Sequence, residues 1–281
     1  MAGLNITVPT NFTSVLKDLS FLKSSQQVNM AYRGLYGKDS ATSLLNNVDN
    51  AVSKQITSVL TRTPEKLTFK KGLFSFVGPG ADSVSATGIR AAVPVSYMIA
   101  DGIPVSLAVS FRNITKVKEA FRRTYPIATF YYAQNGAELT SAPMLCIAAY
   151  IDDSNNHRIC AWSGSIADAK DNLAEQCSVP VDFASGDIIN AVVSRDAAGL
   201  VTLVVKAGNA EPLTAQFKFA KATNLAAETA TEAAVTYGSM NSRTLTSGEI
   251  AIGEFWPRQV LTADEMKGEA ELLYLRSISR I

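Results

Sequence analysis

The sequence predicts a mainly β protein: an antiparallel β-sandwich preceded by a short α-helical N-terminal segment. From residue 67 onward, short alternating or β-rich runs are separated by turn signals such as Asp101-Gly102 and Asn135-Gly136. No long amphipathic helix lies between these runs, which disfavours a parallel sheet built from strand–helix–strand units. The 281 residues suit one sandwich of about 200 residues with a small appendage.

The N-terminal segment is predicted to be helical because its apolar residues recur every three or four positions. One helix is expected over 12–23 and a second over 40–62, with Asp39 or Ser40 as the N-cap of the second. The apolar positions are Phe12, Val15, Leu16, Leu19 and Leu22, and then Leu44, Leu45, Val48, Val52, Ile56, Val59 and Leu60. The helices either pack on the sandwich as an α-hairpin or act in docking or homo-oligomerisation.

A domain boundary is expected between residues 65 and 66. Thr63-Pro64 ends the second helix, because helical geometry is disfavoured for the residue before a proline. Residues 1–65 then form a helical docking or oligomerisation segment, and residues 66–281 form the sandwich.

About a dozen strands are expected in the sandwich. They cover 67–76, 84–92, 96–99, 105–112, 127–133, 144–151, 157–164, 188–195, 200–206, 213–219, 235–239 and 249–255. A short helix over 113–123 and an alanine-rich excursion over 225–234 are expected to lie over an edge of the sandwich.

The stretch 248–266 closes the predicted fold. Its first half is a strand in which Ile250 and Ile252 point to one face. Pro257 cannot extend a central strand, because proline lacks the N–H group that a ladder needs. Thr262 and Glu265 then have the spacing of a capping box, which predicts the start of a helix.

This closing stretch is similar to the last strand of the concanavalin A-like, or laminin-G-like, jelly roll. The matching residues are Ile252-Gly253-Glu254-Phe255, Trp256, Arg258, Leu261-Thr262 and Glu265-Met266. A second match lies in 187–205, where a valine-rich strand meets a turn and then another strand. The resemblance covers 66–281 and implies a two-sheet sandwich. It implies no single activity, because this fold is found in lectins, glycosidases, adhesins and viral coat modules.

Composition argues against several classes of partner. The net charge is +1, so no broad electrostatic attraction to nucleic acid or to an anionic membrane is expected. No apolar run approaches the roughly 20 residues that span a bilayer. The first residues lack the basic and apolar regions of a secretory signal, so we expect synthesis in a cytoplasm without a signal peptide.

The three cysteines, Cys146, Cys160 and Cys177, are expected to be buried thiols. A bridge between Cys146 and Cys160 across a hairpin is an open alternative. The chain has no CxxC motif and a single histidine, His157, so a zinc site is not expected.

Glu249 and Glu254 are the best candidates for a catalytic carboxyl pair. Glycosidases need two carboxyl groups that face one cleft, about 5–5.5 Å apart for retention or about 6.5–9.5 Å apart for inversion. Side chains alternate along a strand, so a separation of five residues predicts opposite faces for these two. Since no G-x-S-x-G motif occurs either, we expect no catalytic residues.

The loop 152–157 is the densest cluster of oxygen ligands in the chain. Asp152, Asp153 and Asn155 form a calcium candidate, since calcium takes six to eight oxygens and similar loops shape sugar sites in legume-type lectins. The alternative is an ordinary hairpin turn, where local hydrogen bonding favours Asp, Asn and Ser. Apart from calcium, no cofactor is expected.

An aromatic–basic face is the other candidate site for a glycan or a protein partner. Tyr125, Tyr131 and Tyr132 follow the basic pair Arg122-Arg123. Aromatic rings stack on sugars or on partner side chains, and arginine binds carboxylates through two hydrogen bonds. A solvated helix face beside core aromatic residues explains the same residues.

These observations predict a non-enzymatic structural protein of a tailed-bacteriophage virion, such as a capsid decoration, tail or fibre component. The basis is the lack of a leader, the Ala-, Ser-, Thr- and Val-rich composition, the few His and Cys residues and the absence of an active-site motif. The expected partners are other virion proteins, further copies of the chain, with a trimer as one arrangement, and a host surface glycan. Nucleic-acid binding and membrane insertion are not expected.

Two other classes stay open. A lectin-like carbohydrate-binding module would use the 152–157 loop or Tyr132. A glycan hydrolase or lyase would need a groove with converging polar groups, for which Arg112, Arg123 and Tyr125 are the nearby candidates.

Overall fold

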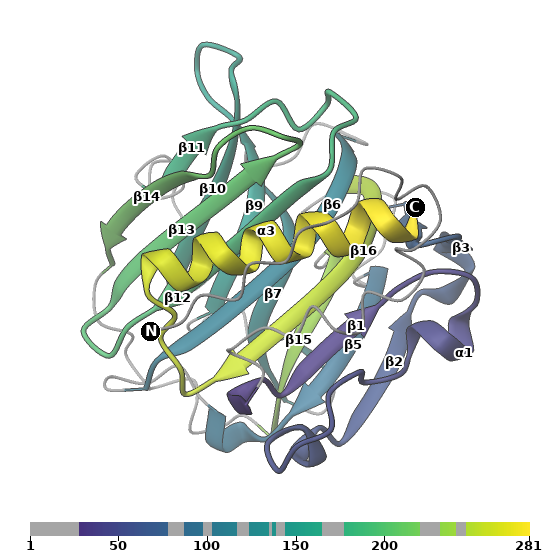
Figure 1. The fold of residues 1–281 in the computed structure, drawn as a ribbon. Coiled ribbons are helices and arrows are strands. Elements are labelled where there is room, and N and C mark those ends of the chain that lie inside the picture. The colour runs from purple at the N-terminus through teal and green to yellow at the C-terminus, as the bar shows by residue number, and fades with distance from the viewer. Residues whose placement is uncertain are drawn as a thin grey trace, which may run out of the picture.

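The computed structural model describes residues 28–77, 87–97, 103–116, 124–134, 137–138, 144–164, 177–219, 231–239 and 246–281. In these residues two antiparallel sheets lie face to face, and a helix covers the outer face of one of them (Figure 1). We call the sheet under the helix the front sheet and the other the back sheet. The predicted fold class, an antiparallel sandwich, is confirmed.

The front sheet has eight strands within the described ranges, in the order β14-β13-β12-β6-β16-β4-β3, with β1 also paired to β16. Their bounds are β1 (Tyr32–Leu35), β3 (Leu67–Lys70), β4 (Leu73–Phe76), β6 (Val105–Lys116), β12 (Ile189–Arg195), β13 (Leu200–Ala207), β14 (Leu213–Lys218) and β16 (Thr246–Pro257). The central strand β16 joins β6 on one side to β4 and β1 on the other.

The back sheet also has eight strands in the described part of the chain, in the order β11-β10-β9-β7-β15-β5-β2, with β8 paired to β7. Their bounds are β2 (Ser58–Arg62), β5 (Thr87–Val93), β7 (Thr124–Gln134), β8 (Ala137–Glu138), β9 (Met144–Ile151), β10 (His157–Gly164), β11 (Ser178–Pro180) and β15 (Glu232–Ser239).

An aromatic core lies between the two sheets. The ring centroid of Tyr237 is 5.9 Å from that of Tyr32 and 6.1 Å from that of Tyr36. Gly34 and Gly253 pair directly between β1 and β16. A Cβ atom at Gly253 would lie 2.6 Å from the Tyr237 ring, and one at Gly34 would lie 2.5 Å from the Tyr32 hydroxyl. The glycine pair therefore gives the tyrosine rings room to pack against backbone.

Helix α3 (Ala263–Arg280) crosses the front sheet above β13, β12 and β6 (Figure 1). It begins with the predicted capping box, in which the Glu265 N–H donates to Thr262 Oγ1 and the Thr262 N–H donates to the Glu265 carboxylate. A second apolar cluster, which includes Trp256 and Met266, is buried between the helix and the sheet. Within the described residues, no helix has the length and apolar character to cross a membrane.

The helix predicted over 40–62 is wrong. The segment contains only α1 (Ser40–Ser43) and the 3-10 turn η3 (Ser53–Gln55) before it becomes β2, and a second 3-10 turn, η4 (Pro64–Lys66), follows. Most of its apolar residues are β-branched, and such side chains favour strands over helices.

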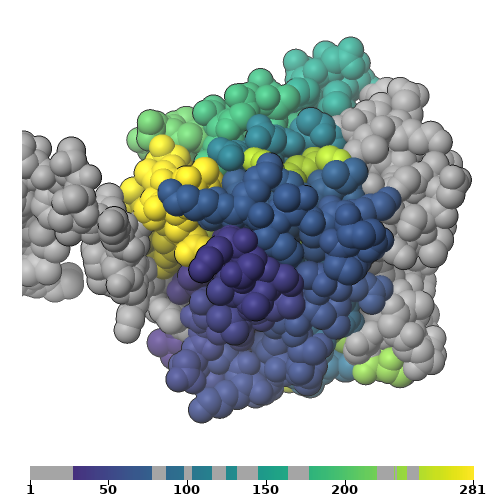
Figure 2. Space-filling view, turned by 90° about the vertical axis from the view of Figure 1, so that its right-hand side faces the viewer, coloured from purple at the N-terminus to yellow at the C-terminus, as the bar shows by residue number. Residues whose placement is uncertain are grey.

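The predicted domain boundary at residues 65 and 66 falls inside the sandwich, because β1 and β2 precede it and pair with β16 and β5. The Nδ2 groups of Asn46 and Asn50 donate to the carbonyls of Ala31 and Met30 at 2.8 and 2.9 Å, which fixes the connecting segment beside β1. Figure 2 shows this part of the chain, in purple and blue, packed beside the end of α3. The helix predicted over 12–23 lies outside the described residues.

Three other predictions need correction. The strand predicted over 67–76 is a β3–β4 hairpin that turns at Gly72, where φ is +75°. Part of the strand predicted over 96–99 belongs to the 3-10 helix η5 (Val95–Tyr97). Strand β6 continues to Lys116, so a helix over 113–123 is wrong in its first residues, and 117–123 lie outside the described residues.

Candidate binding site at the β9–β10 turn

The turn between β9 and β10 is organised by Asp152. Its Oδ1 accepts the N–H groups of Ser154 and Asn156, both at 2.9 Å, and its Oδ2 accepts Asn156 Nδ2 at 3.1 Å. Asn155 takes the left-handed conformation that the turn requires, with φ of 60°. The backbone hydrogen bond from Asn156 is the main cause of a lowered pKa for Asp152. Both oxygens of the Asp152 carboxylate therefore accept hydrogen bonds that hold the turn in its conformation.

A polar hollow of about 350 Å³ lies beside this turn and is lined, among the described residues, by Asp152, Asp153, Ser154 and Arg158. The guanidinium of Arg158 is held in place, because its Nε donates to Ser178 Oγ at 2.8 Å and its Nη2 donates to the Ser178 carbonyl at 3.3 Å. The hollow thus combines carboxylate acceptors, a hydroxyl and a fixed donor. Such a lining can hydrogen-bond a ligand that both donates and accepts.

The calcium candidate Asp152, Asp153 and Asn155 lies at the same turn. Calcium takes six to eight oxygen ligands, whereas the oxygens of Asp152 already face three N–H donors. In the described part of the chain, no group of three His, Cys, Asp or Glu side chains converges on a common point. The donor set fits a hydrogen-bonding site better than a calcium cage.

His157 begins β10 on the opposite side of the strand from Arg158. Its Nδ1 lies 2.6 Å from Asp182 Oδ1, and its ring stacks on Phe183 with centroids 4.2 Å apart. The hydrogen bond from His157 is the main cause of a lowered pKa for Asp182. The contact joins the start of β10 to the loop after β11. Sequence reasoning missed it because Asp182 is 25 positions away.

The prediction of an aromatic–basic binding face is wrong at two of its residues, because both are buried. Tyr125 and Tyr131 are each 3% exposed, so neither ring can stack on a sugar. The Tyr131 hydroxyl accepts from Arg90 Nε at 3.2 Å, within the back sheet. Arg122 and Arg123, and the side chain of Tyr132, lie outside the described residues.

Glu249 and Glu254 lie on the same face of the front sheet, so the prediction of opposite faces is wrong. The pairing of β16 with β6 is irregular, and one irregularity lies between Ile250 and Ile252. A bulge adds a residue to one strand and shifts the alternation of its side chains by one position. Both carboxylates consequently point outward, one beside Arg112 and the other beneath α3.

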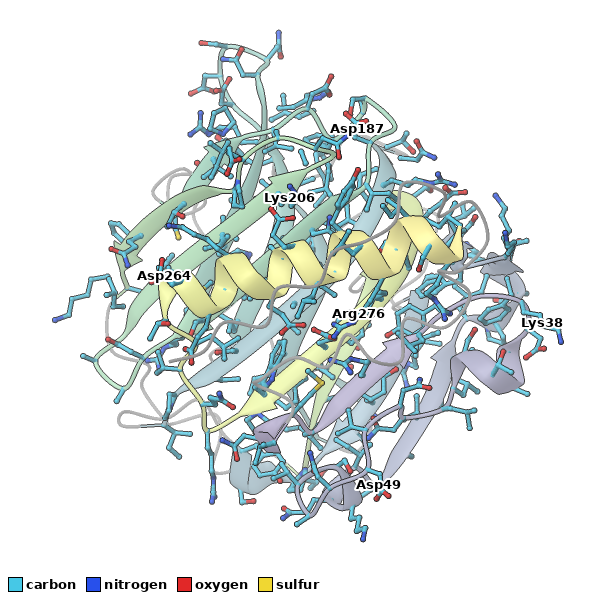
Figure 3. All side chains as sticks on the ribbon, in the orientation of Figure 1. Lys38, Asp49, Asp187, Lys206, Asp264 and Arg276 are labelled. Carbon is cyan, nitrogen blue, oxygen red and sulfur yellow. The ribbon has the colours of Figure 1, made fainter. Side chains whose placement is uncertain are left out.

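Glu254 is the centre of a buried ion cluster beneath α3. Its Oε1 accepts from Arg33 Nε at 2.6 Å and from Arg276 Nη1 at 3.2 Å, and Arg276 Nη1 also donates to Glu269 at 3.0 Å. Figure 3 shows Arg276 below α3, on the side of β1. Burial alone raises the pKa of Glu254, but the two arginines outweigh burial and bring the pKa below its usual value.

Glu249 has a comparable set of partners nearer the surface. Its Oε1 accepts from Lys70 Nζ at 2.9 Å, and its Oε2 accepts from Arg112 Nε at 2.7 Å and Asn113 Nδ2 at 3.0 Å. Burial raises the pKa of Glu249, but these donors outweigh it and bring the pKa down to about 2. Arg112, a candidate for lyase chemistry, is therefore an ion-pair partner of Glu249.

The three cysteines are free and buried, as predicted. Cys146 pairs with Trp162 and Cys160 with Ala148 across β9 and β10, so the two thiols are not directly opposite each other. Burial raises the pKa of Cys146 to about 12, and a thiol with such a pKa is a poor nucleophile.

No family model matches the sequence, and no curated protein sequence matches it. Among solved structures, peanut lectin with a nine-residue peptide is 12% identical, with a TM-score of 0.43 over 73% of this chain and 93% of that chain. The metal-free carbohydrate recognition domain of Emp46p is 14% identical, with a TM-score of 0.43 over 85% and 100%. The seed lectin of Lotus tetragonolobus is 16% identical, with a TM-score of 0.42 over 80% and 96%. These likenesses are distant, and the sandwich is established by its own strand pairing.

Proposed function

We propose that the protein is a non-enzymatic structural component of a tailed-bacteriophage virion, in which a rigid sandwich contacts other virion proteins. The observation that carries the proposal is the ion pairing of the front sheet. Glu249 and Glu254 are each held by two cationic side chains. General acids and bases work with a pKa tuned toward the operating pH, whereas both of these pKa values are lowered. The pairs instead lock strands and helix together, which suits a scaffold.

The virion origin is tested on particles of the phage whose genome carries the gene. After density-gradient purification and a high-salt wash, an antibody against the recombinant protein should detect its antigen at a constant number of copies per particle. A protein that stays in the soluble fraction of the lysate, and is absent from washed particles, contradicts the proposal.

A second function, glycan binding, is favoured by the polar hollow at the β9–β10 turn. Asp153 and Ser154 lie there beside the fixed guanidinium of Arg158. Sugar hydroxyls donate and accept hydrogen bonds, so this set of groups suits them. With Asp152 the lining carries two carboxylates and one guanidinium, and this excess of negative charge favours a neutral glycan over an acidic one.

A glycan array with the full chain, run with and without calcium, tests this function. Asp153→Ala and Arg158→Ala should each abolish a signal that the matched variant Asp187→Ala retains, because Asp187 is an exposed aspartate that does not line the hollow (Figure 3). A signal that survives both substitutions in the hollow contradicts binding there. Loss of the signal on calcium removal would instead favour metal-assisted binding by the turn.

A further inference from the structure

The polar hollow at the β9–β10 turn is lined by Arg158, and Ser178 occupies one edge of the Arg158 guanidinium. Nε donates to Ser178 Oγ at 2.8 Å, and Nη2 donates to the Ser178 carbonyl at 3.3 Å. Ser178 is buried on β11, which pairs with β10 and keeps the serine in place. Of the five N–H donors of a guanidinium, two parallel ones lie on the edge between Nη1 and Nη2. This end edge is the one left for a ligand.

Hydrogen-bond acceptors line the same hollow. Asp152 Oδ2 accepts from Asn156 Nδ2 at 3.1 Å, and a carboxylate oxygen can accept a second hydrogen bond. The side chains of Asp153 and Ser154 also line the hollow. A hydroxyl group satisfies both kinds of partner, because it accepts from a guanidinium and donates to a carboxylate. Two parallel N–H donors suit two such hydroxyls on neighbouring atoms of the ligand.

We propose that the hollow recognises one sugar residue through two neighbouring hydroxyl groups. Both hydroxyls accept from the end edge of Arg158 and donate to aspartate oxygens. Ser178 is the positioning residue, because it decides which edge of the guanidinium meets the ligand. The inference deepens the glycan-binding function proposed above and rests on it.

The size and the lining of the hollow narrow the ligand further. Its volume of about 350 Å³ is at the low end of the range for ligand sites, about 300–1,000 Å³, which suits a single sugar residue. None of the described residues that line it is aromatic, so hydrogen bonds and not ring stacking select the ligand. An acidic sugar could pair with Arg158, but its carboxylate cannot donate and is repelled by Asp152 and Asp153.

Titration of the full chain with the methyl glycosides of glucose, mannose and galactose, followed by NMR chemical shifts, tests the inference. The strongest binder is then compared with its monodeoxy analogues. Loss of either hydroxyl of one neighbouring pair should weaken binding about tenfold, because it leaves a donor and an acceptor in the hollow unpaired. Loss of any other hydroxyl should change the affinity by less than about threefold. The methyl glycoside of glucuronic acid should bind more weakly than that of glucose.

Substitutions of Ser178 and Arg158 test the positioning role. Ser178→Ala removes the acceptor of Nε and should reduce the affinity difference between the sugar and its two sensitive deoxy analogues. Ser178→Thr keeps a hydroxyl group and should restore that difference, which a merely structural role would not explain. Arg158→Lys replaces two parallel donors by a point charge and should also reduce the difference. Thermal unfolding checks that each variant is folded.

Failure of the inference can be told apart from failure of glycan binding. A parent protein that binds neither these sugars nor any glycan on the array contradicts both. A parent that binds glycans on the array but no single-sugar glycoside overturns the inference alone. Dependence on a single hydroxyl, dependence on two hydroxyls that are not neighbours, or a Ser178→Ala variant with the discrimination of the parent would also overturn it and leave glycan binding intact.

Discussion

Arg33 and Glu254 are separated by 221 positions in the chain, yet the Nε of one lies 2.6 Å from the Oε1 of the other. The two residues are also direct partners in the register of β1 and β16. The same carboxylate oxygen accepts from Arg276 on α3. One buried carboxylate thus connects the first described strand, the central strand of the front sheet and the C-terminal helix.

Replacement of Glu254 by Met should lower the free energy of unfolding by about 3–5 kcal/mol, because it leaves the arginines at positions 33 and 276 buried without their shared partner. Urea denaturation at pH 7 measures the change. The control is Glu271→Gln on the same helix. Glu271 pairs with Lys206 but is 46% exposed, so its loss should cost less than about 1 kcal/mol. Equal effects of the two substitutions would contradict a dominant role for the buried cluster.

Glu249 should make part of the stability dependent on pH. Its pKa in the folded protein, about 2, lies below the ordinary value of 4.5. A lowered pKa adds stability that is present above the ordinary value and is lost as the pH falls through the folded value. The parent should therefore be more stable than Glu249→Gln at pH 6, and the difference should shrink between pH 4.5 and 2. Urea midpoints across this range measure it, and a difference that does not vary with pH would refute the assignment.

Gly253→Ala should destabilise the protein by about 1–3 kcal/mol, because the added methyl group overlaps the Tyr237 ring in a packed core. Gly268→Ala provides the matched substitution at an open helical position. It should stabilise the fold by about 0.5–1 kcal/mol, since alanine is the better helix former. Urea denaturation of dilute samples compares the two, and opposite signs are expected.

Substitutions of Asp152 and Asp153 should have different effects, because Asp152 stabilises the turn and Asp153 is proposed to contact the ligand. Asp152→Ala removes the acceptor of three hydrogen bonds within the turn and should lower the temperature of unfolding. Asp153 accepts none of these three hydrogen bonds, so Asp153→Ala should lower the temperature less than Asp152→Ala does, while it weakens glycan binding. Calorimetry on both variants tests the distinction, which fails if Asp153→Ala is the more destabilising of the two.

Local patterns explain which elements were predictable. The strand over 249–255 and the capping box at Thr262 and Glu265 depend on neighbouring residues, and both are present, as β16 and the start of α3. The prediction that Ile250 and Ile252 point to one face is wrong, because the bulge between them places them in different apolar clusters. The segment 40–62 misled the prediction because its apolar residues serve different clusters. Val48 packs under α3, whereas Val52 packs against the core between the sheets. A helical period alone does not reveal such a division.

The candidate site was only partly predictable, for a different reason. The Asp152 turn is local, and its residue types indicated it directly. Arg158 is held by Ser178, which lies on another strand. Glu249 points toward Arg112 because of a bulge in β16, and the residue types around the bulge do not predict its position. The burial of Tyr125 and Tyr131 could not be predicted for the same reason, since burial depends on what packs over a strand and not on the strand's own sequence.

The place of β16 in the front sheet has a consequence for biosynthesis. This strand begins at Thr246, and it alone among the described strands joins β6, β12, β13 and β14 to β4, β3 and β1. Before β16 is synthesised, the described strands of the front sheet form three separate parts with unpaired edges: β14-β13-β12-β6, the β3–β4 hairpin, and β1 alone. Exposed edges of this kind promote aggregation. The nascent chain should therefore need chaperone protection until its last strand emerges, and translation that stops before residue 246 should yield insoluble protein.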